Sequence, residues 1–307
     1  MVADSGNPGP LSPRYWPAWI GVGFLRILIL LPYPALIALG RLIGRSAERV
    51  SRSRRRIADI NLRRCFPDLS ETQRNQLITR HFESLGMGFF EMAMGWWKPE
   101  KALKRLAHVH GLEHLDKARD TGRGVILLSA HFTSIDLTGR LLTMFASFNV
   151  MYRKHENPVV ESLMSHSRDK LTEGAIQSEN VRAMIRALKK GNVVWYASDR
   201  NTQRKQAVFV EFFGHLASTN SAASRLSKIT GALVVPFYGV RRATGDGYDL
   251  FILPSLDDFP TDDIEADARR INAIIEGWVR DYPEQYLWIH RRFRTRPNRK
   301  DLPFYRS

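Results

Sequence analysis

Short apolar runs alternate with amphipathic stretches from about residue 108 onward. The runs are nearly continuous in apolar side chains, as in strands buried on both faces, and they lie at 124–128, 149–152, 192–197, 233–240 and 248–253. Helical spacing between them predicts one helix that Ser178 caps and Gly191 ends, and two more over 220–230 and 262–281. This alternation predicts an α/β fold, with helices flanking a central, mostly buried sheet.

A longer helix is predicted before this region. Ser70 and Gln73 have the spacing of a capping box, and apolar residues such as Phe82 follow at helical intervals. The far end of the helix is rich in Met and Trp, including Met92 and Trp96. These residue types suit a plain core, and they also suit the floor of a tunnel for an apolar chain.

The N-terminal part of the chain has a different composition. Residues 1–14 are predicted to be a flexible tail, and residues 15–45 a hydrophobic membrane-anchor helix. The only charges between Tyr15 and Leu42 are Arg26 and Arg41, and about 20 apolar residues suffice for a membrane span. The alternatives are a helix lying in the membrane interface and a buried hairpin of two core helices. Residues 46–307 are predicted to form the main domain, which ends in a basic tail.

Charge and cysteine content narrow the function classes. Lys and Arg number 46 against 31 Asp and Glu, which gives a formal net charge of +15. Such a charge fits nucleic acid, an anionic membrane or an acidic protein partner. The basic stretch 45–64 directly follows the apolar segment, which favours anionic lipid and places the main domain on the cytoplasmic side. A single cysteine, Cys65, excludes a disulfide framework.

The strongest candidate for chemistry is His131, followed five residues later by Asp136. His131 comes directly after a predicted buried strand, where open α/β sheets place their sites. A turn at this point would let the Asp136 carboxylate bind one imidazole nitrogen and leave the other to accept a proton. Because no nucleophilic Cys or Gly-x-Ser-x-Gly sequence accompanies the pair, the nucleophile would be a hydroxyl of the substrate.

Several further segments occur together with this motif and in a characteristic order. They are YWPAW and LPYP near the start, HFTSID at 131–136, MYRKHENP at 151–158, VVWYASDRN at 193–201, VFVEFFG at 208–214, GALVVPFYGV at 231–240 and HRRFRTRP at 290–297. In this combination the chain resembles the lauroyl/myristoyl acyltransferases that act late in lipid A biosynthesis, from Tyr15 to Pro297. It shares the His-x4-acid motif with glycerolipid acyltransferases, whose fold the resemblance also implies.

The resemblance implies an enzyme on the cytoplasmic face of the Gram-negative inner membrane. It would move a fatty acyl chain from acyl carrier protein to a 3-hydroxyacyl chain of Kdo-bearing lipid IVA, the lipid A precursor, and would need no dissociable cofactor. His131 would be the general base and Asp136 its acidic partner. Asp at the acid position is commoner in the glycerolipid relatives, so a glycerolipid or lysophospholipid acyltransferase is the alternative enzyme.

Further residues are candidates for substrate or oxyanion binding. They follow predicted strands or lie in the basic tail: Arg153, Asp199, Arg200, Arg204, Arg291 and Arg292. No metal site is predicted, because His108 and His110 would supply two ligands without a third. A membrane-tethered nucleic-acid-binding protein is the non-enzymatic alternative, but no nucleic-acid-binding signature supports it and no nucleic acid is expected as a partner.

Overall fold

The computed structural model describes residues 11–152, 154–171, 174–204, 207–298 and 300–305. The predicted tail 1–14 therefore lies largely outside the described residues, and Pro13–Tyr15 forms a short 3-10 helix, η1. The helices are α1 (Trp16–Leu28), α2 (Tyr33–Val50), α3 (Arg52–Cys65), α4 (Glu71–Trp97), α5 (Glu100–Lys104), α6 (Leu112–Asp120), α7 (Ile135–Leu142), α8 (Pro158–Leu171), α9 (Val181–Lys189), α10 (Ala222–Thr230), α11 (Ile264–Asp281) and η3 (Pro283–Gln285). The strands are β1 (Ala107–His110), β2 (Val125–Ser129), β3 (Asn149–Tyr152), β4 (Gly174–Gln177), β5 (Val193–Ala197), β6 (Ala207–Phe212), β7 (His215–Asn220), β8 (Leu233–Arg241) and β9 (Tyr248–Ile252).

A seven-stranded sheet forms the centre of the fold, in the order β1-β9-β8-β2-β5-β3-β4. Its strand pairs are parallel except for the antiparallel pair β8 and β9. The hairpin β6-β7 stands apart from this sheet. All five apolar runs that predict strands form strands, and β2 is buried along its whole length, as expected for a parallel strand covered by helices on both faces.

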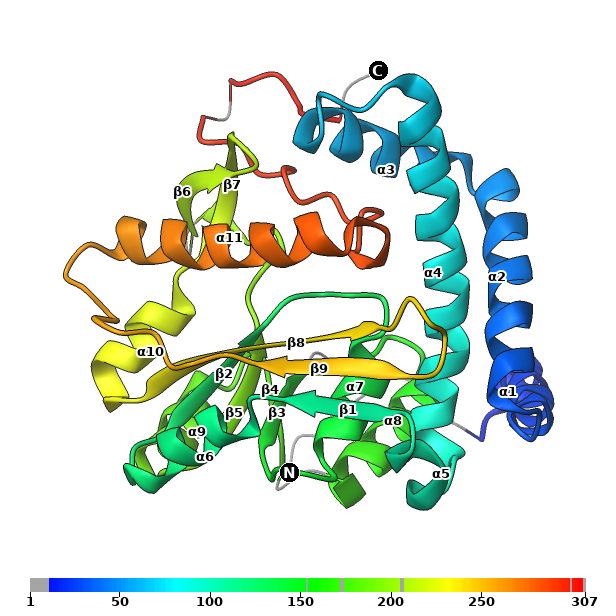
Figure 1. The fold of residues 1–307 in the computed structure, drawn as a ribbon, viewed down its shortest axis with the longest axis horizontal. Helices are drawn as coiled ribbons and strands as arrows, with labels where there is room; N and C mark the ends of the chain where they lie inside the picture. Colours follow the sequence, from blue (N-terminus) through cyan, green and yellow to red (C-terminus); the bar gives the residue numbers. More distant parts are fainter. Residues whose placement is uncertain (1–10, 153, 172–173, 205–206, 299, 306–307) are drawn as a thin grey trace.

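Helices cover both faces of the sheet, as predicted (Figure 1). One hydrophobic core lies under α9, α10 and α11. The other joins α6, α7 and the second half of α4 to the opposite face. The predicted capping box of Ser70 and Gln73 is present at the start of α4. The predicted cap at Ser178 is wrong, because the side chain that caps α9 is that of Asn180.

The apolar N-terminal segment forms two helices instead of the single anchor helix predicted over 15–45. A turn before Pro32 separates α1 from α2, and no helix among the described residues is both long and apolar enough to cross a membrane. The predicted boundary at residue 45 falls inside α2, which packs along α4. A Cβ at Gly44 would overlap the backbone of α4, so glycine is what permits this close approach. The helix α2 thus belongs to the body of the protein.

Candidate active site

His131 and Asp199 meet at the carboxyl ends of two neighbouring strands. Strands β2 and β5 are parallel and in register, with Ser129 opposite Ala197, so the residues that follow each strand lie side by side. The Nδ1 atom of His131 is 2.5 Å from Oδ1 of Asp199, and the backbone N–H of His131 donates to Oδ2 at 3.0 Å. One carboxylate therefore holds both the ring and the main chain of His131.

The Asp199 carboxylate stays ionised in this position. Burial alone would raise its pKa, but the charge of His131 and the two hydrogen bonds from that residue outweigh burial and hold the pKa well below its ordinary value. An ionised carboxylate only accepts hydrogen bonds, so in the neutral imidazole Nδ1 carries the proton and Nε2 has the free lone pair. Within the described residues Nε2 makes no hydrogen bond, and the side chain of His131 is 19% exposed.

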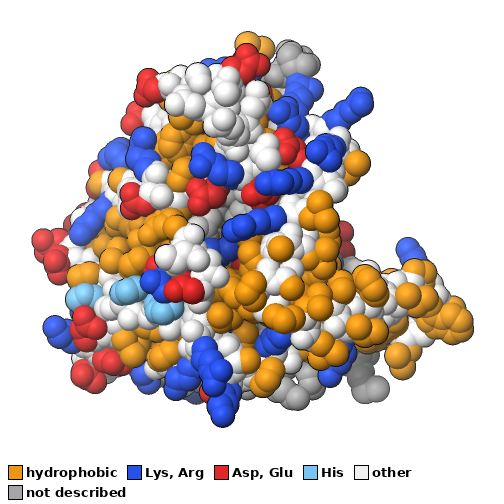
Figure 2. Space-filling model, turned by 45° about the vertical axis from the view of Figure 1, so that its right-hand side comes forward, with side chains coloured by type: hydrophobic (Ala, Val, Ile, Leu, Met, Phe, Trp, Pro, Cys, Tyr) orange, Lys and Arg blue, Asp and Glu red, His pale blue; other side chains and the backbone are white. Residues whose placement is uncertain are grey.

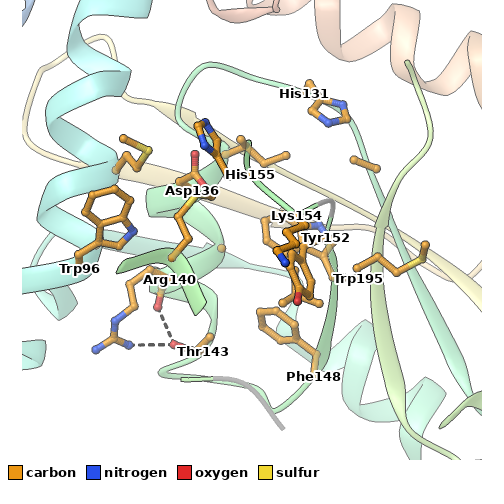
Figure 3. A pocket seen from close by; sticks show the side chains of 18 of the residues that line it. Trp96, His131, Asp136, Arg140, Thr143, Phe148, Tyr152, Lys154, His155 and Trp195 are labelled. Atoms are coloured by element: carbon orange, nitrogen blue, oxygen red, sulfur yellow. Dashed lines mark hydrogen bonds between the residues drawn. The ribbon is translucent and has the colours of Figure 1, made fainter. Parts of the chain in front are cut away.

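The structure corrects the predicted partner of His131. The carboxylate on Nδ1 is that of Asp199 and not that of Asp136, although the five-residue spacing pointed to Asp136. Asp136 lies in the first turn of α7, which is favourable for a negative charge at a helix N-terminus. It lines the same pocket as His131, and Figure 3 shows the two side chains apart within it. A role for Asp136 in the reaction therefore stays a prediction.

A pocket of about 530 Å³ opens beside His131 (Figure 3). Its apolar wall includes Trp96 from α4, Phe148 before β3 and Trp195 from β5. In the Met- and Trp-rich end of α4, Met92 and Trp96 line the pocket, whereas Met94 is buried in the core. A pocket of this size with apolar walls and a few polar groups is typical of small-molecule sites.

The charged side chains of the pocket are mostly basic. Arg140, Lys154 and Arg200 line it together with Asp136 and Glu156. Burial lowers the pKa of Arg140, and Glu100 opposes this shift. Arg140 also donates to Thr143 at 2.8 Å, so the guanidinium is held against α7. These cations suit an anionic or phosphorylated group of a ligand.

The end of η3 and the segment after it hold the turn that carries His131. The backbone N–H of Thr133 donates to the carbonyl of Gln285 at 2.8 Å, and Leu287 N–H donates to the carbonyl of His131 at 3.1 Å. The side chain of Gln285 is in turn bonded to both backbone groups of Arg241 at the end of β8. The turn at His131 is therefore fixed from the C-terminal side as well as by its own strand.

A buried polar network supports the same turn from α4. Arg241 forms an ion pair with Glu91, whose side chain is 1% exposed, and also donates to Thr133 Oγ1 at 3.0 Å. Ser84 Oγ lies 2.6 Å from Thr133 Oγ1, and Tyr248 donates to Glu91 at 2.7 Å. The buried charges of Arg241 and Glu91 compensate each other. Removing one of them would leave the other charge buried without a partner.

His290 lies close to the pair of His131 and Asp199, beside the loop that follows Asp199. Its Nε2 accepts a hydrogen bond from the backbone N–H of Asn201 at 3.1 Å, two residues after Asp199. Burial lowers the pKa of His290 to about 4, and the nearby Asp199 opposes this shift. The imidazole is therefore neutral at pH 7 and serves as an acceptor that positions the loop.

The structure places the remaining predicted site residues in different surroundings. Arg200 is exposed at the pocket, as a ligand contact requires, and Arg153 lies outside the described residues. Arg204 donates to the carbonyls of residues 296 and 297, which holds the tail in place. Arg292 is 2% exposed and donates to the Ser218 carbonyl at 2.7 Å, so its predicted contact with substrate is wrong. Arg291 lines a different hollow from the one beside His131.

The sequence patterns did not identify five residues that line the pocket or support the turn at His131. They are Arg140, Glu91, Arg241, Gln285 and His290. Glu91 had a detectable signal, since an acid inside the apolar half of a predicted helix needs a buried partner. Within the described residues no group of His, Cys, Asp and Glu could hold a metal ion.

Comparison with known proteins gives a consistent family. The family described as bacterial lipid A biosynthesis acyltransferase matches residues 5–295. The lipid A biosynthesis lauroyltransferase of Escherichia coli is 38% identical over 94% of this chain and 94% of its own length. The palmitoleoyltransferase of the same organism is 40% identical with the same coverage.

The fold was also compared with solved structures. The crystal structure of the 1-acyl-sn-glycerophosphate acyltransferase PlsC from Thermotoga maritima is 16% identical, with a TM-score of 0.39 over 81% of this chain and 96% of that chain. The family match and the two E. coli relatives instead extend over nearly the whole chain, including the pocket and the turn at His131. The chain therefore belongs to the bacterial lipid A biosynthesis acyltransferase family.

Proposed function

We propose that the protein transfers a fatty acyl chain from acyl carrier protein to the hydroxyl of a 3-hydroxyacyl chain on Kdo-bearing lipid IVA. The observation that carries this proposal is the His131–Asp199 pair, whose Nε2 atom bonds to none of the described residues and lies beside a pocket that has apolar walls. Family membership supplies the class of acceptor and sets it apart from a glycerolipid acyltransferase.

The pair supports general base catalysis of direct acyl transfer. Nε2 of His131 takes the proton of the acceptor hydroxyl as that oxygen attacks the thioester carbonyl. Asp199 holds the Nδ1–H tautomer and stabilises the imidazolium that forms. Collapse of the tetrahedral intermediate breaks the C–S bond, and the departing thiolate receives the proton from Nε2. The products are the ester, the carrier thiol and a neutral His131.

The lining of the pocket supports separate places for the acyl chain and for the polar groups of the substrates. Trp96, Phe148 and Trp195 offer an apolar wall for the acyl chain, and burial of each methylene contributes about 0.8 kcal/mol. The basic Arg140 and Arg200 suit the phosphate of the carrier's phosphopantetheine arm or the developing oxyanion. The two E. coli relatives transfer chains of different length by name and are almost equally similar, so chain length depends on details of this wall.

The helix α1 supports an interfacial site at the inner membrane, on its cytoplasmic face. Trp16, Ile20, Phe24 and Ile27 recur at helical spacing and are each more than 60% exposed. Figure 2 shows apolar side chains along the part that protrudes at the right. Arg26 is turned away from this face, with its guanidinium 5.5 Å from the ring centre of Trp97. An exposed apolar face of this kind lies in the interface rather than across the bilayer.

Mass spectrometry of lipid A tests the proposed reaction. Lipid A from cells with and without the protein should differ by the mass of one fatty acyl chain. The His131→Ala protein should fail to restore that chain, whereas the wild-type protein should restore it. Unchanged lipid A together with a changed phospholipid acyl composition would instead support the glycerolipid alternative.

A further inference from the structure

Two basic segments that are far apart in the sequence meet at one hollow. It has a volume of about 250 Å³ and is lined by Arg52, Ser53, Arg56, Ile57, Ile60, Arg291 and Tyr305. The first five come from the start of α3, and the other two from the C-terminal tail. The hollow is separate from the pocket beside His131, because the two share no lining residue.

The arginines of this hollow have no acidic partner among the described residues. On and near the same helix, Arg55 pairs with Glu48 at 3.2 Å and Arg74 pairs with Asp59 at 2.8 Å. Across the described parts of the chain, Arg52, Arg56 and Arg291 form no ion pair. Like charges around a small hollow repel one another, so an anion bound between them would be stabilising.

The wall of the hollow is fixed by hydrogen bonds. The Tyr305 hydroxyl donates to Asn61 Oδ1 at 2.8 Å, and the Arg291 guanidinium lies 6.0 Å from the Tyr305 ring centre. Asn61 also donates to the carbonyls of Trp288 and His290, at 2.7 and 2.9 Å. These residues continue the segment that holds the His131 turn, so the hollow and the active site share one support.

We propose that Arg52, Arg56 and Arg291 form a binding site for the phosphate monoester of a lipid headgroup. Guanidinium groups bind phosphate oxygens in bidentate pairs, and Ser53 adds a hydroxyl donor. The volume is below the range of about 300–1,000 Å³ that holds whole small ligands, which suits a headgroup and not an entire lipid. Ile57, Ile60 and the Tyr305 ring would contact the carbons of an attached sugar or glycerol.

The phosphate could come from either of two lipids. The first is the acceptor lipid, and this part of the inference rests on the proposed function. The other source is a phospholipid of the membrane. Both present the same chemical group to the arginines, and the two sources are separated by measuring acceptor kinetics and vesicle binding on the same variants.

The test uses the full-length protein with Arg52, Arg56 and Arg291 all changed to Gln. The control changes Arg54, Arg225 and Arg294, which are exposed and do not line the hollow, to Gln. Both variants lose three positive charges. Circular dichroism and thermal unfolding show whether each variant is folded like the wild type.

Vesicle binding is measured with phosphatidylcholine containing phosphatidic acid, a phosphate monoester, or phosphatidylglycerol, a diester. Acceptor KM and kcat are measured with Kdo-bearing lipid IVA. The site variant should show about a tenfold loss that the control lacks, in acceptor KM or in affinity for phosphatidic acid vesicles, as expected for three exposed contacts of modest strength.

A rise in acceptor KM with unchanged kcat assigns the phosphate to the acceptor, and a loss confined to phosphatidic acid vesicles assigns it to the membrane. Equal effects in the site variant and the control, or no effect in either, would overturn the site. If the wild type proves inactive on the acceptor, the proposed function fails, but the comparison of phosphatidic acid with phosphatidylglycerol still tests the phosphate site.

Discussion

Replacing Asp199 with Asn removes one hydrogen-bond acceptor from His131 with almost no change in volume. In the native protein the carboxylate accepts from Nδ1 at 2.5 Å and from the backbone N–H at 3.0 Å. Asn offers a single acceptor oxygen. If that oxygen keeps the backbone contact, the amide NH₂ faces Nδ1 and forces this atom to accept. The ring proton then lies on Nε2, which can no longer act as a base.

The expected loss follows from the role of that proton. General base catalysis contributes about 10²–10⁴-fold, and Asp199→Asn removes both the tautomer and the charge that stabilises the imidazolium. We therefore expect kcat to fall by about 10³–10⁴-fold, or about 4–5.5 kcal/mol in the activation free energy. The acceptor KM should change little, because the carboxylate is buried beneath the ring and does not line the pocket.

The assay measures transfer from acyl carrier protein to Kdo-bearing lipid IVA at saturating concentrations of both substrates. Asp136→Asn is the matched control, because it also converts a pocket-region carboxylate to an amide but leaves the acceptor on Nδ1 in place. It should lower kcat less than Asp199→Asn does. A wild-type kcat for folded Asp199→Asn, or a greater loss from Asp136→Asn, would refute the assignment of tautomer control to Asp199.

The other predictions concern stability and membrane binding. Glu91→Gln strands the buried guanidinium of Arg241, so urea unfolding should show a loss of about 3–5 kcal/mol; a loss below about 1 kcal/mol would contradict the importance of the pair. The pKa values of His81 and His290 are each lowered to about 4, chiefly by burial. As the pH falls, the unfolded state binds these protons at a higher pH than the folded state does. The free energy of unfolding should therefore be constant above about pH 6.5 and should fall as the pH drops toward 4. Stability that is constant from pH 7 to about 4.5 would rule out this linkage. Changing the exposed Trp16, Ile20, Phe24 and Ile27 to Ser should remove the apolar face of α1 and release the protein from vesicles with its thermal unfolding unchanged; retention on the vesicles would show that α1 is not the membrane contact.

The centre of the sheet could be predicted because strands β2, β5 and β8 are apolar at nearly every position. Burial under helices on both faces makes Val125–Ser129 and Val193–Ala197 continuous apolar runs, and these are easily recognised. The position of His131 at the end of such a run could be predicted for the same reason. The helix boundaries were less certain, since Ser178 and Asn180 are both suitable caps and only the backbone decides between them.

The partner of His131 could not be predicted from spacing. Asp199 lies 68 residues from His131 along the chain, and the two meet only because β2 pairs with β5 rather than with its neighbours in sequence. Asp136 is near in sequence, and local spacing therefore favoured it. Long-range strand order of this kind is not contained in any short pattern of residues.

The surroundings of the apolar and basic segments also could not be predicted from composition. An apolar run such as 15–45 has the composition of a membrane helix and of a packed hairpin, and the structure uses α2 for packing and leaves α1 exposed. Arg291 and Arg292 are neighbours with the same side chain. Their contacts with β7 distinguish them, because the Ser218 carbonyl and the Thr219 hydroxyl bind Arg292 within the core while Arg291 remains exposed.

The most direct test of the account is a comparison of purified wild-type protein with His131→Ala. Both are incubated with acyl carrier protein bearing a fatty acyl chain and with Kdo-bearing lipid IVA, and the lipid product is analysed by mass spectrometry. The wild type should add the mass of one acyl chain. The His131→Ala protein, with an unchanged circular dichroism spectrum, should add none above the level without enzyme. Turnover by folded His131→Ala at the wild-type rate would contradict the proposed role of His131 as the general base.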